Sequence, residues 1–119
     1  MTRTEEFKNR TKQFALRVIK LFRALPRTEE ARVIGRQLLR SGTSVGANYR
    51  AACRGRSRAE FIAKLGIVVE ELDESVYWLE LLVESGIVRA ERLALLTNET
   101  NELLAIFAAA QLTARVGKS

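Results

Sequence analysis

The chain has 119 residues, of which 47% are hydrophobic and 29% are charged, and its formal net charge is +6. This composition excludes a disordered, collagenous or low-complexity chain, and the length suits one domain with one core. Residues 1–64 contain 16 Lys and Arg against five Asp and Glu, whereas residues 65–119 contain four against nine. The first part therefore has a net charge of +11 and the second of −5, which favours a polyanionic partner or a charge-complementary copy of the chain.

The chemistry available to the chain is narrow, because it has one cysteine, Cys53, and no histidine. A single thiol cannot close an intrachain disulfide, and without histidine it cannot belong to a Cys/His zinc site. No stretch reaches about 18 uninterrupted apolar residues, and the first ten residues are polar, unlike a signal peptide. We therefore expect a cytoplasmic protein with no metal site and no membrane segment.

Apolar residues recur at helical spacing between residues 4 and 25 and predict the first helix. Pro26 helps to end it, because proline lacks a backbone N–H donor and restricts the residue before it. Thr28 is a good N-cap for a second helix over residues 29–54, since its hydroxyl can accept a bond from one of the free N–H groups of the first turn. The apolar stripe of this second helix continues past two glycines.

Ser57 and Glu60 match a capping box, in which each side chain bonds to the backbone N–H of the other residue. This motif predicts a third helix over residues 58–85, and a fourth apolar pattern predicts a helix over residues 89–115. Valine and isoleucine do not alternate as they would in strands. Short connections between long amphipathic helices predict an all-α fold, an antiparallel up-down-up-down four-helix bundle formed as a single domain over residues 1–119.

Polar residues lie on or beside the apolar stripe of the second helix, where an unpaired buried amide would cost about 1–3 kcal/mol. We expect Ser41, Ser44 and Asn48 to bond to each other, to Ser75 or to backbone. A polar layer in the core that sets the helix register explains this set better than an active site does.

Small residues interrupt the second helix on what the helical wheel gives as its outer side. Glycine costs about 1 kcal/mol relative to alanine inside a helix, so two glycines four residues apart indicate that another helix approaches closely. We interpret the patch as a subunit interface. Its members are Gly42, Thr43, Gly46 and Ala47.

Arginines recur along the face of the second helix opposite its apolar stripe, because a rotation of 100° per residue places them in one sector. More cations follow in the next loop and the first turns of the third helix. We expect these side chains to bind phosphate groups of RNA or DNA without reading bases. The expected nucleic-acid-binding residues are Arg32, Arg36, Arg40, Arg50, Arg54, Arg56, Arg58 and Lys64. A solvated face that only keeps the bundle soluble is equally consistent with the pattern.

Residues suited to catalysis are missing from the sequence. There is no histidine for acid–base chemistry and no glycine-rich phosphate loop, and the acids of the third helix fall on its solvent side. We therefore expect no enzymatic activity and no cofactor.

Several segments are similar to one bacterial family of four-helix-bundle proteins. They are RSGTSVGANYR (residues 40–50), SRAEF (57–61), KLGI (64–67) and EELDESVYWLELL (70–82). Their order and spacing resemble the 23S rRNA intervening-sequence proteins, from about Phe14 to the end of the fourth helix. The resemblance implies a bundle that assembles into a ring, commonly a homopentamer, with a role in nucleic-acid binding. It extends more distantly to basic pentameric accessory proteins of diversity-generating retroelements, which bind reverse transcriptase and nucleic acid.

The sequence thus supports two hypotheses. In the first, a homo-oligomer presents its arginines to RNA or DNA phosphates. In the second, the chain is a structural or adaptor protein that binds a protein partner. Its arginines then face the acidic side of the third helix in the neighbouring subunit and close a head-to-tail ring.

Overall fold

A computed structural model describes residues 2–117, which form four α-helices. They are α1 (Arg3–Ala24), α2 (Glu29–Cys53), α3 (Arg58–Glu84) and α4 (Ala90–Val116). No strand occurs between residues 2 and 117. The all-α, four-helix prediction is confirmed, and each helix begins and ends within one residue of the range expected from the sequence.

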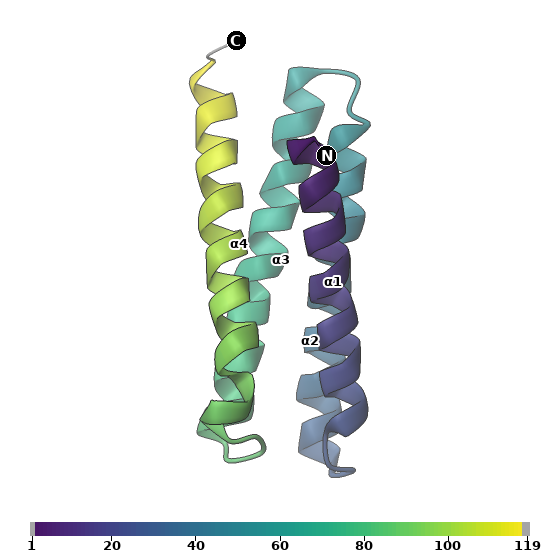
Figure 1. Cartoon of the computed structure of the whole chain (residues 1–119), viewed down its shortest axis with the longest axis vertical. Coiled ribbons are helices and arrows are strands. Elements are labelled where there is room, and N and C mark those ends of the chain that lie inside the picture. Colours follow the sequence, from purple (N-terminus) through teal and green to yellow (C-terminus); the bar gives the residue numbers. More distant parts are fainter. Residues whose placement is uncertain (1, 118–119) are drawn as a thin grey trace.

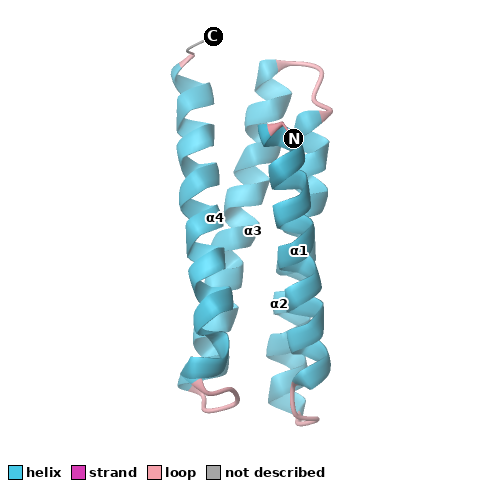
Figure 2. Ribbon diagram, in the orientation of Figure 1, coloured by secondary structure: helices cyan, strands magenta, loops and turns pink. Residues whose placement is uncertain are grey.

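The three connections lie at alternate ends of the molecule, so that consecutive helices run in opposite directions (Figures 1 and 2). The bundle measures 48 × 24 × 22 Å. Among the helix pairs that contact each other, contact is most extensive for α2 and α3 and least extensive for α1 and α4. Within residues 2–117, no helix has both the length and the apolar character needed to cross a bilayer.

The first connection is fixed by proline and threonine. Leu25 is extended, with φ −67° and ψ 148°, because the ring of Pro26 disfavours helical geometry in the residue before it. Thr28 then caps α2 by accepting a hydrogen bond from the N–H of Ala31 at 3.3 Å. The turn from α1 to α2 is therefore short.

Only half of the expected capping box forms at the start of α3. Ser57 accepts from the N–H of Glu60 at 3.1 Å, but the Glu60 carboxylate accepts from the N–H of Arg56 at 3.4 Å instead of from the cap residue. A complete capping box closes at the start of α1, where Thr2 and Glu5 exchange both bonds at 3.1 Å.

Side chains from all four helices meet in one core, including Phe14, Leu38, Leu72 and Leu103, none of which is more than 1% exposed. α2 contributes to this core towards both α1 and α3. Its apolar side is therefore wider than the single stripe read from the sequence.

The glycines of α2 lie on this wider apolar side. A Cβ atom on Gly42 would come within 2.9 Å of Cγ2 of Val18, and one on Gly46 within 3.2 Å of Oγ1 of Thr11. The helix that approaches closely is thus α1 of the same chain. The expectation of a subunit interface is wrong for Gly42 and Gly46, because α1 buries both residues.

The other two residues of the expected interface differ from the glycines. Thr43 is half-buried and donates its hydroxyl to the carbonyl of Leu39 at 2.7 Å. Ala47 is exposed. The four small residues therefore do not form one patch.

The polar layer in the core is a pair of serines. The hydroxyls of Ser41 and Ser75 lie 2.8 Å apart, and both side chains are fully buried between α2 and α3. Ser44 and Asn48 do not join them, because both bond within α2: the Ser44 hydroxyl donates to the carbonyl of Arg40 and the Asn48 amide to the carbonyl of Ser44. The expected layer of four residues is thus reduced to two.

Candidate nucleic-acid interface

Arg40 forms ion pairs within the chain. Its guanidinium pairs with Glu71 at 3.2 Å and also with Glu74, so that it joins α2 to α3. Glu74 in turn accepts from the indole N–H of Trp78 at 3.4 Å. A guanidinium already shared between two carboxylates attracts phosphate weakly, because its charge is balanced. The expectation that Arg40 binds nucleic acid is therefore not supported by its contacts.

Arg10 plays the same part between α1 and α4. It pairs with Glu99 at 2.8 Å and with Glu102, and the hydrogen bond to Glu99 raises the pKa of the Arg10 guanidinium above its ordinary value. Sequence reasoning missed this pair. The available signal was the spacing of the two glutamates, three residues apart on α4, which places both on one side of the helix.

Arg58 also has an internal partner. Its guanidinium donates from Nε and Nη2 to the carbonyl of Ala114, at 3.1 and 2.9 Å, in the last turn of α4, where this carbonyl also accepts from the N–H of Gly117 at 3.3 Å. The side chain stays exposed, but two of its donors are occupied. Lys64, on the next turns of α3, is half-buried.

The remaining expected residues are exposed, and none forms an ion pair within residues 2–117. They divide into two groups at opposite ends of α2. Arg32 and Arg36 lie beside the connection to α1, and Arg50, Arg54 and Arg56 lie beside the connection to α3. At 1.5 Å per residue, Arg32 and Arg54 are about 33 Å apart along the helix.

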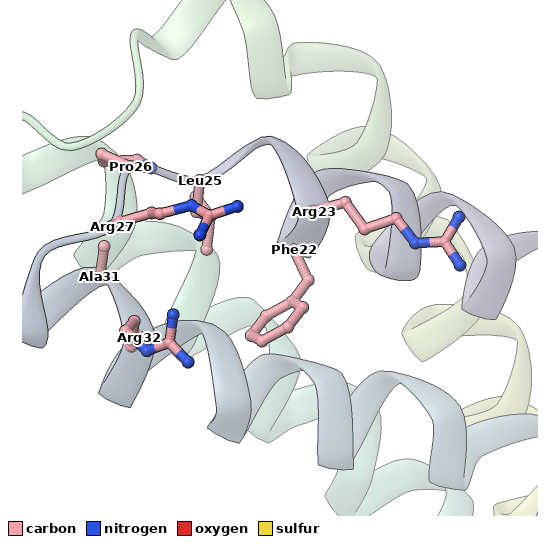
Figure 3. Close-up of a pocket in the computed structure, with 7 residues that line it drawn as sticks. All are labelled: Phe22, Arg23, Leu25, Pro26, Arg27, Ala31 and Arg32. Atoms are coloured by element: carbon pink, nitrogen blue, oxygen red, sulfur yellow. The ribbon is translucent and has the colours of Figure 1, made fainter.

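Two further arginines join the group at the α1–α2 connection. Arg23, Arg27 and Arg32 line a pocket of about 390 Å³ together with Phe22 and Pro26, among others. In Figure 3 the guanidiniums of Arg27 and Arg32 point towards the space beside the Phe22 ring, whereas Arg23 extends away from it. Arg23 and Arg27 were not predicted from the sequence, because the arginine pattern was followed only from the second helix onwards.

We call these two groups the turn cluster and the corner cluster. The turn cluster is Arg23, Arg27, Arg32 and Arg36, and the corner cluster is Arg50, Arg54 and Arg56. Each is exposed and free of ion pairs within the part of the chain that the structure describes. Exposed, uncompensated guanidiniums are suited to phosphate oxygens, which they can bind through two parallel hydrogen bonds.

Residues 3–109 match the model of the 23S rRNA-intervening sequence protein family. The chain belongs to this family. The resemblance stated from the sequence is thereby confirmed, and the matched range contains both arginine clusters.

A solved structure agrees with this assignment. The chain is 34% identical to a protein of unknown function from the S23 ribosomal protein family of Bacteroides thetaiotaomicron VPI-5482, and the two folds agree with a TM-score of 0.85. The match covers 92% of this chain and 98% of that protein. No similar protein was found among curated proteins. The shared fold therefore positions α2 and its arginines but assigns them no activity.

Proposed function

We propose that the chain is a non-enzymatic nucleic-acid-binding protein that contacts RNA or DNA phosphates through the turn and corner clusters. One observation carries the proposal. Arg10 and Arg40, which lie along the middle of the helices, are each shared between two glutamates, whereas the seven arginines of the clusters have no ion-pair partner within residues 2–117. The fold thus leaves positive charge available at both ends of α2.

The spacing of the clusters favours a duplex. About 33 Å separates Arg32 from Arg54, and one turn of B-DNA measures about 34 Å, so a duplex lying along α2 presents phosphates of successive turns to both clusters. Recognition of single strands is less favoured, because it depends on exposed aromatic rings on which bases stack. Tyr77 is the large exposed aromatic side chain of residues 2–117, and it lies on α3.

Two further parts belong to the proposal. The family resemblance supports assembly into a homo-oligomeric ring, commonly a pentamer, and the single cysteine, Cys53, suits the reducing cytoplasm in which we expect the chain to act. A ring would repeat both clusters around its circumference, and binding at several sites at once raises the overall affinity without new contacts.

Fluorescence polarization with a labelled RNA or DNA duplex tests the proposal. With about five phosphate contacts, the affinity should fall by about two to three orders of magnitude between 50 and 200 mM salt. Arg54→Glu should weaken binding at least tenfold. Lys12→Glu changes the net charge by the same amount at an exposed position of α1 and should have little effect. Equal losses in both variants, or an affinity independent of salt, would contradict the proposal.

A second function is favoured by the exposed face of α3. Glu70, Asp73, Glu80 and Glu84 are all exposed there, on both sides of Tyr77, which is 52% exposed. This acidic face could receive the arginines of a neighbouring subunit, as the adaptor hypothesis requires. In that case Arg36→Glu should shift the particle to smaller species in light scattering, while a ring of unchanged mass would exclude the idea.

A further inference from the structure

A groove of about 660 Å³ lies where α1 and α4 separate. Its walls are the second half of α1, the loop between α3 and α4, and the first turns of α4. Figure 1 shows both the α1–α2 and the α3–α4 connections at this end of the bundle. The groove exists because α1 and α4 contact each other least among the neighbouring helices.

The floor of the groove is apolar and its two edges are cationic. The apolar lining residues include Leu21, Leu25, Ile87, Val88, Leu93 and Leu96, which are buried or half-buried. Leu95 stands at the rim and is 76% exposed. The cationic lining residues are Arg17 and Lys20 on α1, and Arg89 and Arg92 beside and on α4.

Most of this positive charge is unbalanced. None of the residues lining the groove is acidic. Within residues 2–117, the one lining cation in an ion pair is Arg89, whose partner at 3.6 Å is Glu91, outside the lining, and both side chains are highly exposed. Arg17, Lys20 and Arg92 therefore attract carboxylates from both sides of an apolar channel. An occupant that satisfies the groove needs apolar side chains in the centre and acids on both flanks.

We propose that this groove binds an acidic, amphipathic helix of a different protein. Between Arg17 and Leu25, α1 offers about 12 Å of wall at 1.5 Å per residue, which matches about two turns of a bound helix. Such a helix presents apolar side chains at positions i, i+4 and i+7 to the floor, and glutamates or aspartates on its flanks to the cations. Charge complementarity on both edges fixes its position and suppresses basic partners.

A second copy of the chain does not offer this chemistry within residues 2–117. The large exposed apolar side chains there include one pair at helical spacing, Leu112 and Val116, and Arg115 lies between them with no acid on the last two turns of α4. The acidic face of α3 contributes Tyr77 as its large exposed apolar residue. Nucleic acid is disfavoured too, because the floor consists of aliphatic side chains that phosphates cannot use.

The proposal can be tested with a labelled synthetic helix of about 15 residues that has leucines at i, i+4 and i+7 and glutamates on its flanks. In fluorescence polarization with the full chain, it should bind at least tenfold more tightly than a scrambled peptide of the same composition. Arg92→Glu and Leu95→Asp should each weaken binding about tenfold or more. Leu95 is highly exposed, so its variant should keep the fold, as circular dichroism would verify.

Arg54→Glu is the matched control, because it changes the same charge at the far end of α2 and should leave peptide binding unchanged. Equal binding of the scrambled peptide, or no loss in the groove variants, would overturn the proposal. So would a smaller particle for Leu95→Asp in light scattering, which would make the groove a contact between copies. Duplex binding by the same variants, measured separately, reports on the nucleic-acid function alone.

Discussion

The two arginines that pair with glutamates of another helix and the arginines at the two ends of α2 use their charge differently. Arg10 and Arg40 each connect two helices through a pair of glutamates, so their charge is balanced by carboxylates of the same chain. Arg32 and Arg54 face solvent without an ion-pair partner among residues 2–117. Position on a helical face alone therefore does not define a binding residue. A guanidinium is available to a ligand only where the neighbouring helix brings no carboxylate to it.

The length of the duplex gives the largest expected effect. A duplex of about 12 base pairs reaches both end clusters, whereas one of about six base pairs reaches only one. Because the second contact is then intramolecular, the longer duplex should bind about 100-fold more tightly, measured by polarization at low salt. Equal affinities would show that the two clusters do not act on one ligand, and the division into middle and ends would lose its functional meaning.

The interior of the bundle should respond to alkaline pH. A tyrosine in the unfolded chain ionises near pH 10, and burial raises the pKa of Tyr49 to about 12 in the fold. The unfolded chain therefore loses this proton first. The contribution of buried, neutral Tyr49 to stability is fully present below pH 10. Between pH 10 and 12 the free energy of unfolding should fall by about 2–3 kcal/mol.

Chemical denaturation across this pH range measures the loss. Tyr49→Phe keeps the ring contact with Phe107, at 5.1 Å between centroids, but cannot titrate, so it should lose less stability than the unaltered chain. Tyr77→Phe, at an exposed position, should behave like the unaltered chain. Identical alkaline profiles for all three proteins would refute this account of Tyr49.

The close contact of α1 and α2 predicts the next effect. Gly42→Leu would place its side chain against Val18, where even a Cβ atom comes within 2.9 Å, and should lower the free energy of unfolding by about 2 kcal/mol. Ala47→Leu adds the same side chain at an exposed position of α2 and should change it by less than about 0.5 kcal/mol. Urea denaturation measures both, and equal effects would place Gly42 outside the interior.

The smallest effect separates two arginines one helical turn apart. Arg40→Gln should lower the free energy of unfolding by about 0.5–1 kcal/mol, because it breaks a half-exposed pair with Glu71 and Glu74. Arg36→Gln, with no such pair, should not lower it. Duplex binding should show the opposite: Arg36→Gln should weaken the affinity a few-fold, whereas Arg40→Gln should not change it. If Arg40→Gln weakened binding as much, the middle of the bundle would belong to the interface.

The helices could be predicted closely because their limits are encoded locally. Pro26, Thr28 and Ser57 act within a few residues of themselves, and each limits a helix as expected. One residue of the apolar pattern that predicts the fourth helix, Leu112, is not buried as that pattern indicates. It is 64% exposed, since the last turns of α4 extend beyond the start of α1 (Figure 1).

The candidate site was less predictable because its residues depend on distant partners. Arg40 is neutralised by residues 31 and 34 positions further along the chain. Gly42 and Gly46 face α1 because α2 packs against two helices, which a wheel centred on one stripe does not represent. For the cluster arginines of α2 and the following loop, the sequence correctly predicted that the side chains are exposed. It did not predict Arg23 and Arg27, because they come near Arg32 through the turn between α1 and α2.

We propose above that the unpaired arginines at the two ends of α2 bind phosphates. The most direct test is the slope of log affinity against log salt concentration for a duplex, measured for the unaltered chain and for a double variant with Arg32→Gln and Arg54→Gln. Each lost phosphate contact should reduce the slope by about 0.9, so the double variant should show a decrease of about 1.8. An unchanged slope would contradict the claim and would place the nucleic-acid contacts, if any form, elsewhere on the molecule.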